Sequence, residues 1–148
     1  MNRCARHVAS QIACVAVVAI SSLGLAGCSS HAPAGAADST VQVNERDFKI
    51  SATRRVRSGS VRFLVHNGGP DAHELIVVRT SSAKLPLRRD GETVDEEALH
   101  KATPGTLEPG QPGSRRSLKL HLPPGRYELI CNMSGHYLGG MHAALVVQ

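Results

Sequence analysis

The sequence predicts an all-β protein built as a β-sandwich. Short runs in which apolar and polar residues alternate are separated by Gly, Pro and Asn, a pattern typical of strands joined by turns. Removal of an export signal, described below, leaves 121 of the 148 residues, which is enough for one domain with a modest core. Several short strands in a domain of this size favour two packed sheets.

Six segments carry the strand pattern and one carries a helix pattern. Thr93 and Glu96 have capping-box spacing, so we expect one short helix around residues 94–101. The rest of Thr80–Arg116 is polar, contains several Pro and Gly, and is too long for a hairpin loop. We expect it to cross between the sheets or to pack on an edge. The predicted strands are Val41–Ile50, Ser60–Asn67, His73–Arg79, Ser117–Leu122, Arg126–Cys131 and Met141–Val147.

The N-terminus has the pattern of a bacterial lipoprotein signal. Arg3 and Arg6 precede an uncharged apolar run that is short for a membrane span. The run ends in Leu25-Ala26-Gly27-Cys28, which resembles the lipobox, in which the cysteine is acylated and becomes the first mature residue. We expect a signal peptide over residues 1–27, lipidation of Cys28, a flexible tether over residues 28–40 and a folded domain over residues 41–148. The alternative is an ordinary signal peptide that ends near a cysteine.

Charge and cysteine content narrow the class of protein. The mature chain has 15 Lys and Arg against 12 Asp and Glu, interspersed and with few aromatic residues, so nucleic-acid binding is not expected. Cys4 and Cys14 leave with the signal and Cys28 is lipidated, so Cys131 is the one remaining thiol. A lone thiol in an oxidising compartment needs protection, and a metal–sulfur bond would provide it.

Strand alternation predicts which way the candidate ligands face. It places Cys131 and Met141 on the buried faces of their strands. His73 shares a face with Leu75 and Val77, although the opposite face of that strand is apolar too. The residues expected on solvated faces are His66, His121, His142, Arg126 and Glu128.

Four residues form a candidate metal set: His73, Cys131, His136 and Met141. Thiolate and thioether are soft ligands that suit Cu(I), while imidazole also serves Cu(II), so this set can hold copper in both oxidation states. Structural zinc is the weaker interpretation, because a thioether is a poor zinc ligand. We therefore expect one copper per chain. Met133, a second thioether in the same loop, is interpreted as packing.

The chain resembles the cupredoxins, the type 1 blue copper proteins, and most of all the plastocyanin- and azurin-like bacterial lipoproteins. Cys131-x₄-His136-x₄-Met141 has the spacing seen in rusticyanin and sulfocyanin. Three further segments match the family pattern: Val61–Asn67, Pro70–Leu75 and Leu122–Cys131. The resemblance implies a Greek-key β-sandwich with copper at one end. It implies that His73 and His136 bind through Nδ1, Cys131 through sulfur and Met141 weakly along the axis, with the Glu74 N–H donating to the sulfur. Many cupredoxins have Asn at the position of Glu74, where its side chain ties two ligand loops together.

The expected function is single-electron transport between redox partner proteins outside the cytoplasm, by a monomer lipid-anchored to a bacterial membrane. The alternative is a copper chaperone or buffer on the cell envelope. Such proteins favour open Met- and His-rich clusters, which are absent from the sequence. A copper enzyme would need a second copper site and usually a second domain, so we do not expect an enzyme. Leu138, with Pro70 nearby, is expected to form an apolar docking patch around His136.

Overall fold

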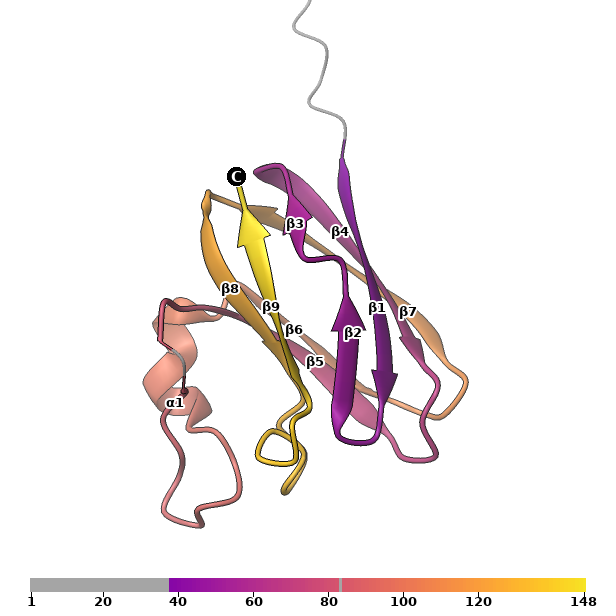
Figure 1. The fold of residues 1–148 in the computed structure, drawn as a ribbon, viewed down its shortest axis with the longest axis vertical. Coiled ribbons are helices and arrows are strands. Elements are labelled where there is room, and N and C mark those ends of the chain that lie inside the picture. Colours follow the sequence, from indigo (N-terminus) through magenta and orange to yellow (C-terminus); the bar gives the residue numbers. More distant parts are fainter. Residues whose placement is uncertain (1–37, 83) are drawn as a thin grey trace, which may run out of the picture. The chain divides into compact units, whose positions relative to one another are not determined.

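The computed structural model describes residues 38–82 and 84–148, which form two β-sheets packed face to face (Figure 1). This confirms the predicted all-β sandwich with one short helix. The expected signal peptide, Cys28 and most of the tether lie outside the described residues, so these remain predictions. No helix in the described part of the chain is long and apolar enough to cross a bilayer.

The first sheet has the strand order β2-β1-β4-β7. Its strands are β1 (Ser39–Arg46), β2 (Lys49–Ala52), β4 (Gly59–Asn67) and β7 (Arg115–Leu122), with β1 parallel to β4. The prediction of one strand over Val41–Ile50 was wrong, because a turn at Asp47 and Phe48 divides it. Within one strand, buried side chains recur at every second residue. Val41, Val43 and Glu45 follow this alternation, but Ile50 is out of step with them, as expected when a turn separates two strands.

The second sheet has the order β3-β9-β8-β5-β6. Its strands are β3 (Arg55–Val56), β9 (His142–Val147), β8 (Gly125–Ile130), β5 (His73–Arg79) and β6 (Gly105–Gly110). Strand β6 lies inside Thr80–Arg116 and was not predicted; it pairs with β5 as an edge strand. The chain then crosses to β7 in the first sheet, so the expected crossing is present.

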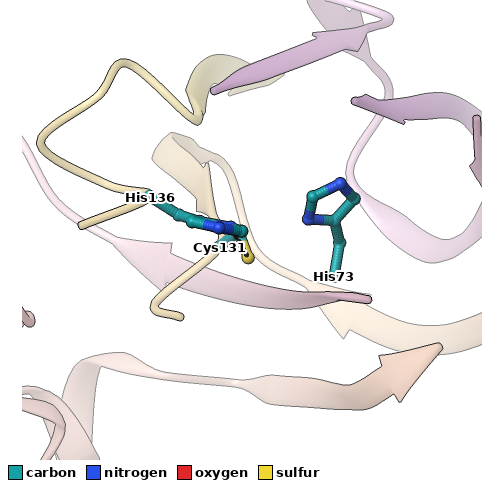
Figure 2. A group of neighbouring side chains, drawn as sticks. All are labelled: His73, Cys131 and His136. Carbon is teal, nitrogen blue, oxygen red and sulfur yellow. Dashed lines mark hydrogen bonds between the residues drawn. The ribbon is translucent and has the colours of Figure 1, made fainter. Parts of the chain in front are cut away.

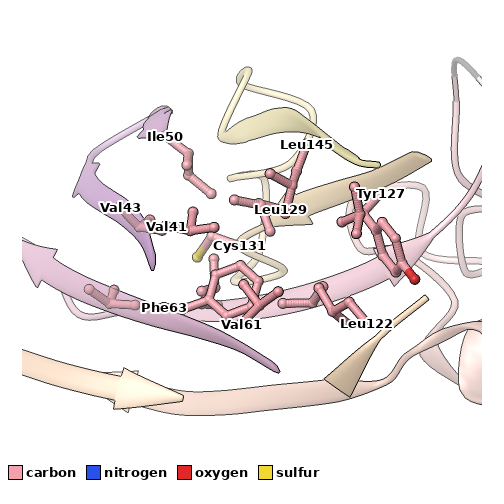
Figure 3. Packing of buried hydrophobic residues seen from close by; sticks show 14 of the residues in the cluster. Val41, Val43, Ile50, Val61, Phe63, Leu122, Tyr127, Leu129, Cys131 and Leu145 are labelled. Atoms are coloured by element: carbon pink, nitrogen blue, oxygen red, sulfur yellow. The ribbon is translucent and has the colours of Figure 1, made fainter. Parts of the chain in front are cut away.

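The main core fills the space between the sheets (Figure 3). Phe63, Leu75, Leu129 and Leu145 are fully buried there. Burial of each large apolar side chain contributes about 1.5–3 kcal/mol, so this layer dominates the stability of the domain. Cys131 and Met141 belong to the same cluster and are fully buried, which confirms their predicted facing.

Residues 84–104, which we call the excursion, form a second layer on the outer face of β5 and β8. The excursion contains α1 (Glu96–Leu99) and the 3₁₀ turn η1 (His100–Ala102). The N-cap is Asp95, which accepts from the Ala98 N–H at 3.1 Å, rather than Thr93. Apolar side chains of both layers meet in an outer cluster of six buried residues: Ile76, Val78, Leu85, Val94, Ile130 and Tyr137.

The outer layer explains why strand β5 is apolar on both faces: both faces are covered. Alternation within a strand cannot detect a layer supplied by a distant segment.

Glu128 was expected on a solvated face, and this was wrong. It is 9% exposed, and its Oε1 lies 2.8 Å from Nδ1 of His142 in the neighbouring strand β9.

Candidate metal centre

Two strands and one loop deliver the candidate ligands to one end of the sandwich. His73 is the first residue of β5, and Cys131 directly follows β8. His136 and Met141 lie in the connection from β8 to β9, which we call the ligand loop (131–141). Strands β5 and β8 are antiparallel neighbours, so the start of β5 and the end of β8 lie at the same end of the sheet.

His73, Cys131 and His136 come together as a compact buried group (Figure 2). One ligand atom from each lies within 4.8 Å of the others. Cys131 Sγ is 3.5 Å from His136 Nδ1, and the two imidazole centroids are 5.2 Å apart. Two nitrogens and a sulfur around one point form three of the donors that the sequence predicts for copper.

The unpartnered Nδ1 of His73 fits a metal at this point. His73 is fully buried, and only one of its two ring nitrogens has a polar protein atom nearby within the described residues. Nε2 lies 3.0 Å from Asp47 Oδ1, while Nδ1 has no protein partner. Buried nitrogens without partners are costly, and a metal at Nδ1 would remove that cost. Asp47 would then orient the ring from the other side, as carboxylates do for metal-bound histidines.

The electrostatics of the group favour a bound cation. Burial raises the pKa of the Cys131 thiol to about 11, opposed by hydrogen bonds from the backbone of Met133 and Glu74. Burial, and then the neighbouring His136, lower the pKa of His73, while Asp47 opposes them. A thiolate and two neutral imidazoles are what a copper ion requires, and a cation supplies the charge that makes the thiolate favourable here.

The ligand loop is a folded turn with its own backbone hydrogen bonds. The N–H of His136 donates to the Met133 carbonyl at 2.9 Å, and the N–H of Met141 donates to the His136 carbonyl at 2.9 Å. The Cys131 N–H donates to the Met141 carbonyl at 3.1 Å, so residues ten apart close the loop. Gly135 and Gly140 have φ of 76° and 102°, a region that favours glycine. Met141 is thereby fixed in the core next to the group, fully buried.

Glu74 ties the two ligand segments together. Its Oε1 accepts from the Asn132 N–H at 3.0 Å, which links the residue after His73 to the residue after Cys131. This carboxylate thus makes the kind of tie that the resemblance assigns to an Asn at this position. Asn67, fully buried, braces the loop before His73, because its side chain donates to the carbonyls of Asp71 and Gly110 at 2.7 and 2.9 Å.

Asn132 also joins the ligand loop to the excursion. Its side chain accepts from the Val94 N–H at 2.6 Å and donates to the Val94 carbonyl at 3.1 Å and to Glu96 at 2.7 Å. Tyr137 adds a second link, since its hydroxyl accepts from the Leu85 N–H at 3.1 Å. The outer layer therefore holds the loop that carries three of the four candidate ligands.

Phe48 lies against His136 at the ligand-loop end of the sandwich, and the sequence did not predict this contact. It has φ of 58° in the β1–β2 turn, and its ring lies edge-on to His136 with centroids 5.4 Å apart. A side chain at Gly139 would collide with it, so the ring lies directly on the loop backbone. His136 is only 9% exposed as a result, less than expected, whereas Phe48 and Leu138 are 54% and 55% exposed. The break in alternation before Ile50 could have placed Phe48 in a turn, but not against His136.

A buried ion pair lies beside the group. Glu45 is fully buried, and its Oε2 accepts from Arg116 Nη2 at 2.8 Å, while the same Nη2 donates to the His73 carbonyl at 3.1 Å. Burial raises the pKa of Glu45 to about 7, and Arg116 opposes that rise. The sequence alone does not mark this pair, because an inward-facing Glu becomes apparent only once the register of β1 is known.

The remaining histidines of the described residues do not belong to the group. His121 and His142 are exposed, and His66 is half-buried on the outer side of β4, as alternation predicts. Met133 is partly buried and packs against the main core. Within the described residues, no further cluster of His, Cys, Asp and Glu could hold a metal ion.

Comparisons with known proteins agree with the fold. The copper-resistant cuproprotein CopI of Rubrivivax gelatinosus is 31% identical over 98 residues, which are 66% of this chain and 58% of CopI. Auracyanin of Roseiflexus castenholzii superposes with a TM-score of 0.60 at 20% identity, over 74% of this chain and 97% of its own. Rusticyanin of Thiobacillus ferrooxidans gives 0.54 at 14% identity, over 74% and 77%. No protein-family model matches the chain.

These likenesses establish the fold: the described domain is a cupredoxin-type β-sandwich. Cupredoxins bind one copper, and the His73–Cys131–His136 group could hold it. The chain spans less than two thirds of the length of CopI, so the activity of that whole protein is not carried over.

Proposed function

We propose that this chain is a type 1 copper protein that carries single electrons between redox partners outside the cytoplasm. The observation that supports this most strongly is the buried His73–Cys131–His136 group, in which Nδ1 of His73 has no protein partner. Met141 would be the weak fourth ligand. Copper in such a site supplies a one-electron couple, and a non-enzymatic role fits the cupredoxin fold.

The protein supplies rigidity and exclusion of water. His73 is held at the start of a buried strand, and the ligand loop is braced by its own turns, by Glu74 and by the excursion. A site fixed in this way changes little between two oxidation states, which keeps the reorganisation during electron transfer small. Phe48 covers His136 and limits the access of solvent to its ring.

Electrons would enter and leave through an apolar patch around His136. Phe48 and Leu138 are both more than half exposed at this end of the sandwich. A small apolar surface suits brief docking, since transient redox encounters bury little area. The partner proteins are not identified by the chain itself.

Copper handling is the second candidate, and the similarity to CopI favours it. A handling protein must release or exchange its metal, whereas a carrier keeps it through many cycles. The buried, braced group supports the carrier, because every candidate ligand is at most 9% exposed.

One experiment distinguishes the two. The protein is loaded with copper, and its midpoint potential and the off-rate of Cu(I) to a chelator are measured on one sample. A carrier gives a reversible couple and Cu(I) loss far slower than electron exchange. Irreversible voltammetry together with rapid Cu(I) transfer would support handling. Failure to bind copper in a defined ratio of one per chain would refute both.

A further inference from the structure

The charges of the described domain are separated between its two ends. We call the end opposite the ligand loop the basic pole; strand β1 begins there, and β7 ends there (Figure 1). The pole carries seven exposed cationic side chains and two side-chain carboxylates, Asp38 and the nearly buried Glu128. The rest of the domain has eight cationic side chains and ten carboxylates. The seven are Arg54, Arg55, Arg57, Arg62, Arg79, Lys119 and Arg126.

Strand register places these cations around one end. Arg62 and Lys119 face each other across β4 and β7, and both reach Asp38, at 3.7 and 2.8 Å. Arg79 donates to the Pro124 carbonyl at 3.0 Å, in the turn that leads into β8. Asp38 is the only exposed side-chain carboxylate that the described residues place at this pole, so most of the positive charge of its side chains is uncompensated.

Arg55 and Arg57 are two neighbouring exposed cations of this pole. They lie on either side of Val56 and line a shallow hollow of about 340 Å³ beside the start of β1, which Asp38 and Gln148 also line. No carboxylate of the described residues pairs with either side chain, and both are exposed. Two free guanidinium groups at a hollow suit phosphate, which arginine binds in a bidentate manner.

The chain also enters the folded domain at this pole. Strand β1 begins at Ser39, and ten residues separate it from the predicted lipidation site, Cys28. Ten residues span at most about 35 Å, so an acylated Cys28 would keep the basic pole close to the bilayer. Anionic lipid surfaces attract basic clusters within about one Debye length, which is near 10 Å in ordinary buffers.

We propose that the basic pole docks on anionic phospholipid headgroups and so directs the ligand loop away from the bilayer. The phosphates of a lipid surface match both the charge of the pole and the position at which the chain enters it. The docked orientation leaves Phe48 and Leu138, at the other end, open to a soluble partner. The proposal does not depend on the metal.

The test measures binding of the mature chain, residues 28–148, carrying Cys28→Ala so that it has no acyl chain, to two kinds of vesicle: pure phosphatidylcholine and a 7:3 mixture with phosphatidylglycerol. Arg55→Glu/Arg57→Glu is compared with Arg88→Glu/Arg89→Glu, which makes the same change of net charge in the excursion, where both arginines are also exposed. Arg55→Gln/Arg57→Gln is a milder version. Circular dichroism confirms that each variant is folded.

We expect the parent chain to prefer the anionic vesicles by about tenfold or more in 50 mM salt, with the preference lost in 0.5 M salt. Arg55→Glu/Arg57→Glu should abolish the preference, the Gln pair should reduce it, and Arg88→Glu/Arg89→Glu should retain it. Equal binding to both vesicles would overturn the proposal and favour an acidic protein as the partner of this pole. Equal losses in the two Glu pairs would also overturn it, because net charge alone would then explain the binding.

Discussion

Cys131 and Asn132 are neighbours in the chain but belong to different layers of the molecule. Cys131 is buried in the core between the sheets, whereas Asn132 holds the excursion on the outer face of the second sheet. The inner layer is built from alternating strands, and the outer one from an irregular segment. The difference teaches that the metal site depends on both: one layer positions the ligands and the other holds their loop.

The largest expected effect is in the inner layer. Cys131→Ser should abolish the intense visible absorption of the copper-loaded protein, because the band requires a thiolate ligand. The domain should remain folded, since Ser is smaller than Cys and the surrounding core is intact. Absorption and thermal unfolding are measured on the same sample. A strong band in the variant would show that Cys131 is not the thiolate ligand.

Adjacent residues of β8 compare the layers directly. Leu129 is fully buried in the inner cluster and Ile130 in the outer one. Leu129→Ala and Ile130→Ala should each lower the free energy of unfolding by about 2–5 kcal/mol. Urea unfolding followed by far-UV circular dichroism measures the free energy of unfolding of each variant.

Only Ile130→Ala should also speed limited proteolysis within residues 84–104, because its partners are there. If cleavage is equally fast in the two variants, residues 84–104 do not unfold independently of the core between the sheets.

The buried carboxylate of Glu45 predicts that the stability of the protein depends on pH. Glu45 has a pKa of about 7 in the folded protein against an ordinary value of 4.5, so the folded state holds a proton that the unfolded chain has released. Glu45 should therefore contribute a fall of up to about 3 kcal/mol in the stability of the metal-free protein as pH rises from 4.5 to 7. Glu45→Gln should remove this contribution, while Glu74 and Glu128, whose pKa values burial also raises, keep theirs. Urea midpoints at several pH values measure it, and an unchanged slope would assign the dependence to another group.

Asn132→Ala breaks the link between the layers. It leaves the backbone N–H and carbonyl of Val94 without these partners and should cost about 1–3 kcal/mol. Loss of Cu(I) to a chelator should become faster, since the ligand loop is held less firmly. Ser134→Ala is the control: it removes one exposed contact of the same loop with Glu92 and should change little. Identical Cu(I) off-rates in wild type and Asn132→Ala would show that the outer layer does not stabilise the site.

The smallest expected effect lies at the surface. Leu138→Asp should slow electron self-exchange by about tenfold, because leaving a carboxylate desolvated in the contact costs on the order of 1–2 kcal/mol. Leu64→Asp is the matched control, an exposed leucine on the outer side of β4. The visible spectrum should be unchanged in both. A spectrum altered by Leu138→Asp would mean that Leu138 supports the loop rather than the docking patch.

The inner layer was largely predictable from the sequence, because alternation along a strand is local. It gave the buried facing of His73, Cys131 and Met141 and five of the nine strands in nearly their observed places. Strands β2, β3 and β6 were missed, since each is short or follows a turn that the pattern does not mark. The roles of Phe48, Glu45 and Asn132 depend on contacts between residues 38 to 88 positions apart, which no local pattern contains.

The pairing of β3 with β9 has a consequence for the order of folding. Arg55 and Val56 pair with Val146 and Val147, and the Ser58 N–H donates to the Gln148 carbonyl at 2.7 Å. A chain synthesised from its N-terminus therefore keeps this edge of its second sheet open until residues 146–148 arrive. The ligand loop lies between β8 and β9, so it too closes only with that final strand. A metal site that needs the whole ligand loop therefore forms only after β9 has paired, and a chain truncated before β9 should be unable to retain copper.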